Sequence, residues 1–161
     1  MLKTERLTIH PASDAEMRDL IDHTDDEGLK LAYTEMLTMA LENPQYRPWY
    51  AAWFIENTDG QRLGELCFKG LSADGTAEIG YGILPDFQNR GYATETVKAV
   101  TAWALSQPGV NCITAETEAD NLASQKVLRS CGFLATGEQG EEGPLFVLHS
   151  DHLKKTGVNE S

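Results

Sequence analysis

The stretch that decides the fold is residues 78–94, which read Glu-Ile-Gly-Tyr-Gly-Ile-Leu-Pro-Asp-Phe-Gln-Asn-Arg-Gly-Tyr-Ala-Thr. It begins as a strand, which Pro85 ends because proline lacks the N–H that a ladder needs. A short loop follows, and apolar spacing predicts a helix over residues 94–105. The first turn of a helix presents unpartnered backbone N–H groups and a positive dipole end. This junction therefore favours phosphate binding, since Gly91 and Ala93 keep side chains out of the way.

Outward from this junction, apolar periodicity predicts the remaining elements. Two-residue alternation indicates strands, and apolar positions three and four residues apart indicate helices. The predicted order is a strand at 6–10, a short helix after 13, a helix over 29–41, strands at 49–56, 61–69 and 76–84, a helix over 94–105, a strand at 111–118, a helix over 121–131, and strands at 133–138 and 145–149. This order fits one mixed α/β sheet of about seven strands with four helices. We expect one domain over residues 1–150 and a tail over residues 151–161.

Composition and charge exclude several classes of protein. The chain has 161 residues and a formal net charge of −12, with 25 acidic residues against 13 Lys and Arg. Such a surface repels phosphate backbones, so we expect no nucleic-acid or anionic-membrane partner. No apolar run approaches the ~18 residues of a membrane span. Three widely spaced cysteines predict reduced thiols and a cytoplasmic location, and His149 with His152 lacks a third ligand, so we expect no metal.

Two motifs carry a resemblance to a known family. Gly-x-x-x-x-Gly-Lys-Ser/Thr is absent from the sequence, and Gly-x-Gly-x-x-Gly follows no predicted strand. Residues 88–93 instead form Gln-x-x-Gly-x-Ala, which resembles the acetyl-CoA-binding motif of the GNAT superfamily of N-acetyltransferases. Residues 121–124 and 131–133 are similar to that family's Asn-x-x-Ser…Gly-Phe helix. Thr-Glu-Arg-Leu at 4–7 and Glu-Ile-Gly-Tyr at 78–81 are similar to the RimJ/RimL-like branch of ribosomal-protein N-terminal acetyltransferases.

The resemblance implies the GNAT fold over Leu2 to about His149, with the central strands splayed at the cofactor site. It implies acetyl-CoA (coenzyme A) as co-substrate, with the pyrophosphate on the loop amides and pantetheine along the preceding strand. The residues implied in cofactor binding are Ile83, Leu84, Gln88, Asn89, Arg90, Gly91, Tyr92, Ala93, Thr94 and Asn121. Gly80 and Gly82 would let a ligand approach closely, or they mark a β-bulge.

For the reaction, the resemblance implies direct attack of an amine on the thioester in a ternary complex. Glu78 is the candidate general base, with Glu116 as runner-up, although a solvated strand glutamate is the alternative. Many family members carry a tyrosine seven residues after the motif asparagine, where this chain has Leu128. Ser124 is the remaining hydroxyl on that helix, and it either bonds the leaving sulfur or satisfies the helix start.

The resemblance implies that the first helices line the groove for the acceptor. Residues 14–42 hold nine acidic and two basic side chains, which favours a cationic amine such as a basic peptide terminus, a polyamine or an aminoglycoside-like amine. Charge runs also simply solvate helices, so this alternative stays open. The other functional alternatives are a catalytically weak, coenzyme A-binding or sensing module and an O-acetyl or longer-chain acyltransferase. The sequence leaves open whether the protein is a monomer or a homodimer.

Overall fold

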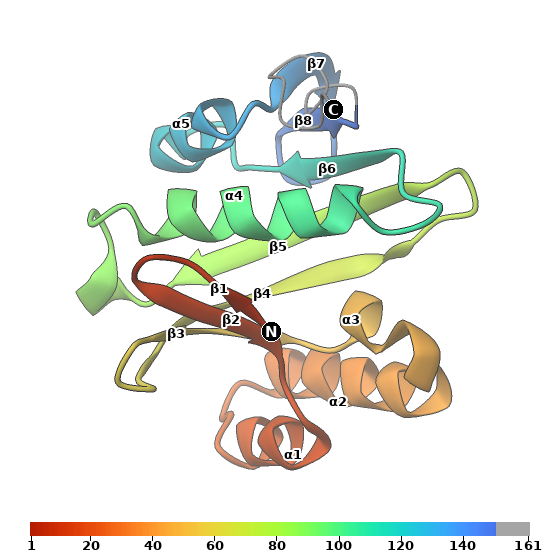
Figure 1. Cartoon of the computed structure of the whole chain (residues 1–161), viewed down its shortest axis with the longest axis vertical. Helices are drawn as coiled ribbons and strands as arrows, with labels where there is room; N and C mark the ends of the chain where they lie inside the picture. Colours follow the sequence, from red (N-terminus) through yellow and green to blue (C-terminus); the bar gives the residue numbers. More distant parts are fainter. Residues whose placement is uncertain (151–161) are drawn as a thin grey trace.

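The computed structural model describes residues 1–150, and the tail expected over residues 151–161 lies outside them. The described part is one mixed sheet flanked by helices (Figure 1). The strands are β1 (Leu2–Lys3), β2 (Leu7–Pro11), β3 (Trp53–Asn57), β4 (Arg62–Leu71), β5 (Thr76–Ile83), β6 (Cys112–Glu116), β7 (Leu134–Gln139) and β8 (Pro144–His149). The helices are α1 (Asp14–Asp22), α2 (Glu27–Glu42), α3 (Arg47–Tyr50), α4 (Tyr92–Leu105) and α5 (Leu122–Ser130), with short 3₁₀ turns η1 (Pro44–Tyr46) and η2 (Pro85–Phe87).

The sheet order confirms the predicted mixed α/β architecture. Within residues 1–150 the eight strands run β1-β2-β3-β4-β5-β6-β8-β7, where about seven were predicted. The additional strand is β1, whose two residues are too few to show a period. The additional helix is α3, which directly follows η1. The sequence predicts this segment as a loop because it contains Pro44 and Pro48. Both prolines lie in the first turn of their helix, where a missing N–H costs no hydrogen bond.

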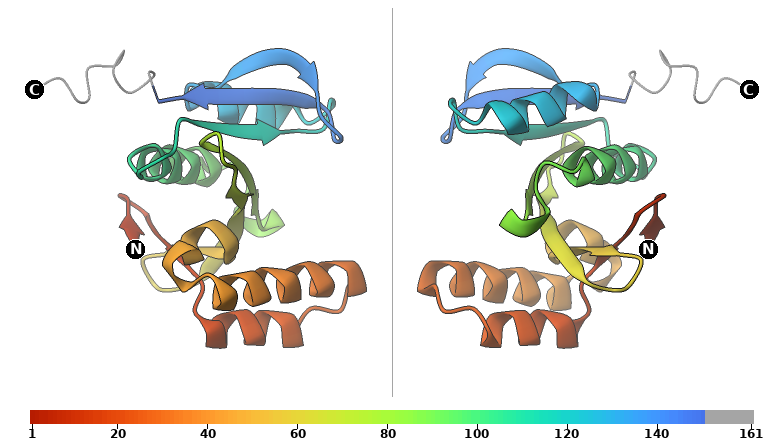
Figure 2. Two further views of the ribbon diagram at one scale, coloured as in Figure 1. Left: turned by 90° about the vertical axis from the view of Figure 1, so that its right-hand side faces the viewer. Right: turned by 90° about the vertical axis from the view of Figure 1, so that its left-hand side faces the viewer.

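The two central strands part as predicted. β5 and β6 are parallel, and their register covers only Thr76 to Glu78 against Cys112 to Thr114. β5 continues to Ile83, while β6 continues to Glu116 in register with β8. Beyond Glu78, therefore, β6 gives β5 no ladder partner. The splay separates β6, β8, β7 and α5 from the rest of the sheet, as Figure 2 shows.

Apolar side chains form two clusters on the two faces of the sheet. The larger packs α4 against β2–β6, where Trp49, Trp53, Phe68 and Trp103 stack edge to face or tilted with ring centroids 4.8–6.1 Å apart. The smaller lies under α1 and α2 and includes residues such as Tyr33. Burial of this apolar surface, at roughly 25 cal/mol per Å², holds α1 and α2 in place beside the end of β5. No helix within residues 1–150 is both long and apolar enough to cross a membrane.

Candidate functional site

The loop between β5 and α4 exposes backbone donors. Asn89 and Gly91 both adopt left-handed backbone conformations, with φ of 64° and 84°. Gly91 is the N-cap residue of α4, and no side chain caps the helix there. The helix begins at Tyr92, two residues before the predicted start. Because the first-turn amides have no capping side chain, this end of α4 can accept an anion.

A cavity of about 490 Å³ lies between this loop, the end of β5 and α5. Most of the residues predicted to bind the cofactor line it: Ile83, Gln88, Asn89, Gly91, Tyr92, Ala93, Thr94 and Asn121. Leu84 instead lines a second cavity on the other side of β5. Arg90 lines neither cavity, is exposed, and holds its guanidinium 6.0 Å from the Phe87 ring. Among the described residues that line the first cavity, Lys126 is the one charged side chain. We name it the cofactor cavity after the residues of its lining that were predicted to bind the cofactor.

Arg6 is a residue that sequence reasoning missed. Its Nη1 donates to the Arg90 carbonyl at 3.0 Å, its Nε pairs with Glu95 at 2.7 Å, and its guanidinium lies 4.4 Å from the centre of the Tyr92 ring. Thr4 also donates to the Glu95 carboxylate. Partial burial opposes ionisation of Glu95, but these hydrogen bonds lower its pKa overall. The segment before β2 thus fixes the amide loop. The Thr-Glu-Arg-Leu motif was the available signal.

Gly80 and Gly82 do not mark a bulge. The β4–β5 register is continuous there, with Cys67 opposite Gly80 and Glu65 opposite Gly82, and it shifts only between Phe68 and Leu71. A Cβ atom on Gly82 would meet nothing within 4 Å. Gly82 therefore leaves open space on the face of β5 that it shares with Glu65, whereas a Cβ on Gly80 would lie 3.8 Å from Cys67 Sγ.

Glu78 lies where β5 and β6 part. Its carboxylate pairs with Lys69 Nζ at 3.1 Å. Burial lowers the pKa of Lys69, but the hydrogen bond with Glu78 raises it overall. A cavity of about 250 Å³ collects Glu78, Glu116 and Ser124, which were all predicted site residues, together with Tyr81 and Asn121. We name it the splay cavity.

Two hydrogen bonds, one of the backbone and one of the side chain, position Ser124. Its N–H donates to Asn121 Oδ1 at 3.0 Å, so Asn121 caps α5 at the start of the helix predicted over 121–131. Its hydroxyl is 2.9 Å from the hydroxyl of Tyr81 on β5. Burial raises the pKa of the Tyr81 phenol. The sequence analysis assigns no role to the Tyr81 side chain, because no local pattern indicates which face of β5 meets α5.

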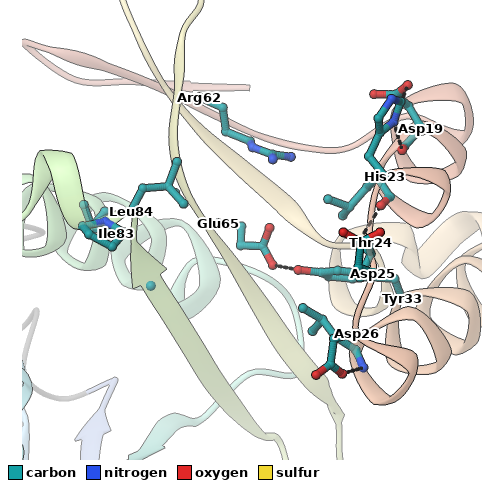
Figure 3. A pocket seen from close by; sticks show the side chains of 15 residues that line it. Asp19, His23, Thr24, Asp25, Asp26, Tyr33, Arg62, Glu65, Ile83 and Leu84 are labelled. Carbon is teal, nitrogen blue, oxygen red and sulfur yellow. Dashed lines mark hydrogen bonds and ion pairs between the residues drawn. The ribbon is translucent and has the colours of Figure 1, made fainter.

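The second cavity, of about 550 Å³, lies between α1, α2 and the ends of β4 and β5. Figure 3 shows the Glu65 carboxylate meeting the Tyr33 hydroxyl, which donates to it, between Asp25 on one side and Ile83 on the other. Burial and the Glu65 hydrogen bond raise the pKa of Tyr33. The charged residues of this lining are Asp19, Asp25, Asp26 and Glu65 against Arg62, with His23 3.3 Å from Asp19. We name it the acidic cavity.

The two cavities share a wall. Gly82 and Ile83 line both of them. Successive strand residues face opposite sides of a sheet. Accordingly, Tyr81 contacts α5 on the cofactor side, whereas Gly82 lies opposite Glu65 on the α2 side. A ligand in one cavity can therefore meet a ligand in the other at the end of β5.

Several curated proteins are similar to part of this chain. An uncharacterised N-acetyltransferase of Bacillus subtilis (strain 168), YjdG, is 34% identical over 94 residues, which are 57% of this chain and 56% of that protein. The matches span about half the length of such curated relatives.

Solved structures share the fold at low identity. The spermidine N-acetyltransferase of Vibrio cholerae in complex with CoA and spermine has a TM-score of 0.72 at 13% identity, covering 92% of this chain and 98% of that one. RimL, a ribosomal L7/L12 α-N-protein acetyltransferase in complex with coenzyme A, has a TM-score of 0.69 at 16% identity, covering 91% and 95%. Residues 4–134 match the acetyltransferase (GNAT) domain, and the chain belongs to that family.

Proposed function

We propose that this protein is an N-acetyltransferase that moves the acetyl group of acetyl-CoA to a primary amine by direct attack in a ternary complex. The observation that carries the proposal is the shared wall at Gly82 and Ile83, where an amide-lined cavity and an acidic cavity meet beside parted strands. Ligands in open α/β sheets bind at such strand ends. A thioester carrier and an amine can thus approach each other from opposite sides of β5.

The amides of residues 89–94 would hold the cofactor diphosphate, since they begin α4 without a capping side chain. Pantetheine would lie along the β6-facing edge of β5, which has no ladder partner from β6 after Glu78. Gln88 Nε2 donates to the Ile83 carbonyl at 2.8 Å, which ties the loop to the end of that strand. Leu84, which lines the acidic cavity, would then border the reacting end of the cofactor.

Glu78 would act as general base, directly or through water in the splay cavity, with Glu116 in the same cavity as the alternative. The attacking amine must be neutral. A lysine-like amine of pKa ~10.4 costs about 4.6 kcal/mol to deprotonate at pH 7, at ~1.36 kcal/mol per pKa unit. An α-amine of pKa ~7.7–8.0 costs only about 1–1.4 kcal/mol. A base therefore contributes most when the acceptor is a side-chain or polyamine amine.

The acceptor would be a cationic amine bound in the acidic cavity. Three acidic residues of the 14–42 segment line this cavity, and Glu65 on β4 is the fourth acidic side chain of its lining. Asp26 also caps α2 through the Leu29 N–H, Asp19 pairs with His23, and Glu65 accepts a hydrogen bond from Tyr33. Among the described residues of this lining, Asp25 is therefore the carboxylate without a protein partner. Glu65 would contribute to ammonium binding through the lone pairs that Tyr33 leaves open. The V. cholerae neighbour is a spermidine acetyltransferase with spermine bound, and RimL modifies a protein N-terminus. Both acceptor types, the second expected of the RimJ/RimL-like branch, suit this charge.

A coenzyme A-binding module without transfer is the second candidate, because Leu128 stands where many family members have a catalytic tyrosine. A cytoplasmic location is part of the proposal, in keeping with three free cysteines.

To test the proposal, the purified full chain is incubated with acetyl-CoA and a panel of amines that includes polyamines, basic peptides and neutral amines. Thiol release and product masses are followed, with calorimetry on acetyl-CoA and CoA in parallel. Transfer to cationic amines ahead of neutral ones supports the proposal. Heat without thiol release would favour the binding module, and absence of heat from either ligand would refute both. Hydroxyl acceptors and longer acyl-CoA donors in the panel test the O-acyl and chain-length alternatives.

A further inference from the structure

Two hydroxyl groups meet at the parting of β5 and α5. Tyr81 projects from β5 and Ser124 from the first turn of α5, and their oxygens are 2.9 Å apart. Both residues line the cofactor cavity and the splay cavity, which also holds Glu78. The position that carries a tyrosine in many relatives is here Leu128, whose side chain is fully buried in the core and has no polar atom.

One O–H of this pair has no partner among the residues that the structure describes. Two hydroxyls offer two donors, and the bond between them uses one. Within residues 1–150 neither hydroxyl forms another hydrogen bond. Whichever oxygen donates inside the pair, the other O–H is free to donate into the cavities that both residues line. Hydrogen bonds in such a chain also polarise one another.

We propose that Tyr81 accepts a hydrogen bond from Ser124 and is a catalytic residue that donates its own O–H to the coenzyme A sulfur as negative charge develops there. This inference rests on the proposed acetyl transfer. It assigns the role of the absent tyrosine to a residue on a different element, β5 instead of α5. A donor placed where charge develops stabilises the transition state without prior reorganisation.

The step balances as follows. The amine nitrogen forms a bond to the acetyl carbonyl carbon, and its proton passes to the base or to water. The C–S bond then breaks, and sulfur keeps the electron pair while it accepts the hydrogen bond. Tyr81 keeps its proton, because a phenol of pKa ~10 or above is a weaker acid than a thiol of pKa ~8.5. CoA leaves as the thiolate and takes a proton from water.

Calorimetry on free CoA and desulfo-CoA, which lacks the sulfur, isolates this contact without any turnover. At about pH 9, above a thiol pKa of ~8.5, we expect the wild-type protein to bind CoA roughly tenfold more tightly than desulfo-CoA. Tyr81→Phe removes only the hydroxyl and should bring this ratio close to one, with desulfo-CoA affinity within about twofold of wild type. Tyr46→Phe, at an exposed position in η1, is the matched control and should keep the wild-type ratio.

Kinetics give the second readout. With the best amine found, Tyr81→Phe should lower kcat by about 10- to 100-fold, the range of one oxyanion-type donor at its lower end, and leave KM for acetyl-CoA within about twofold. Ser124→Ala provides a second route if Tyr81→Phe is unstable, because it removes the other half of the pair. An unchanged CoA to desulfo-CoA ratio in both variants would overturn the inference. If the wild-type protein transfers no acetyl group, the proposed function fails, and the binding ratio alone still decides the hydroxyl–sulfur contact.

Discussion

Gly64 on β4 and Gly82 on β5 lie one register position apart, since Gly64 pairs with Ile83 and Gly82 with Glu65. The structure nevertheless predicts opposite outcomes when each receives a side chain. A Cβ on Gly82 would have open space within 4 Å, whereas a Cβ on Gly64 would lie 2.2 Å from the Gly82 carbonyl oxygen. Gly82 has an ordinary strand backbone, without positive φ. Gly82→Val should therefore fold and even gain about 0.4–1 kcal/mol from the stiffer unfolded chain. Gly64→Ala should cost about 1–3 kcal/mol through overpacking.

These energies translate into melting temperatures. At roughly 2–4 °C per kcal/mol for a chain of this size, Gly82→Val should melt up to about 4 °C above wild type and Gly64→Ala about 2–12 °C below it. The activity of Gly82→Val should fall despite its gain in stability. The valine side chain would project into the acidic cavity, at the wall that this cavity shares with the cofactor cavity. Because a misplacement of about 1 Å at a reacting centre can cost about 100-fold, acetyl transfer should fall by that order.

The assay pairs thermal melts with acetyl transfer and CoA calorimetry on wild type, Gly82→Val and Gly64→Ala. CoA binding to Gly82→Val should stay near the wild-type value, since the new side chain lies on the Glu65 face of β5. A folded Gly82→Val protein that transfers acetyl at the wild-type rate would refute the meeting of the two substrates at this wall. Equal melting temperatures for the two variants would refute the packing argument.

The remaining predictions concern the base, the loop and pH. Glu78→Gln should lower kcat by about 10²–10⁴-fold with little change in CoA affinity, measured against exposed Glu138→Gln, and wild-type activity in Glu78→Gln would remove it as the base. Arg6→Ala should raise KM for acetyl-CoA about tenfold at unchanged kcat. Arg6→Lys should restore little of this loss, because lysine lacks the planar guanidinium that reaches both Glu95 and Arg90. Full recovery of KM in Arg6→Lys would indicate that charge alone matters. Because the pKa of Glu95 lies below its ordinary 4.5, its contribution to stability is present above that pH and is lost as pH falls through the lowered value. Urea unfolding from about pH 7 to pH 3 should show this loss in wild type and a smaller one in Glu95→Gln.

Patterns among neighbouring residues predicted the secondary structure better than the sequence could predict contacts between distant residues. The loop at 88–93 could be predicted because proline, glycine and the start of a helix determine the backbone conformation of neighbouring residues. The same holds for the helices predicted after residue 13 and from residue 121, where Ser13 and Asn121 cap the first turn. Tyr81 and Ser124, by contrast, are 43 residues apart, and Arg6 and Arg90 are 84 apart. Contacts at such separations depend on which strands pair, which periodicity alone does not encode.

The acidic segment shows the same limit. Counting charges over residues 14–42 indicated a cationic ligand, but only three of its acids line the acidic cavity, and two of those also bind protein groups. Glu65 lies outside the counted segment and reaches the cavity because β4 places it opposite Gly82. The inference from charge therefore needs the sheet register to identify the residues that would meet an ammonium group.

The distribution of charge also explains how a chain of net charge −12 could bind an anionic cofactor. Screening limits electrostatic forces to about 8 Å at physiological ionic strength, so the lining of each cavity outweighs the total. Within residues 1–150 the cofactor cavity has Lys126 and the amides of α4 but no carboxylate in its lining, while four carboxylates line the other cavity. β5 lies between the two cavities, and Gly82 adds no side chain to the wall that they share. Ligands of opposite charge would thus enter from opposite faces and meet where the strands part, which a chain of uniformly acidic surface could not arrange.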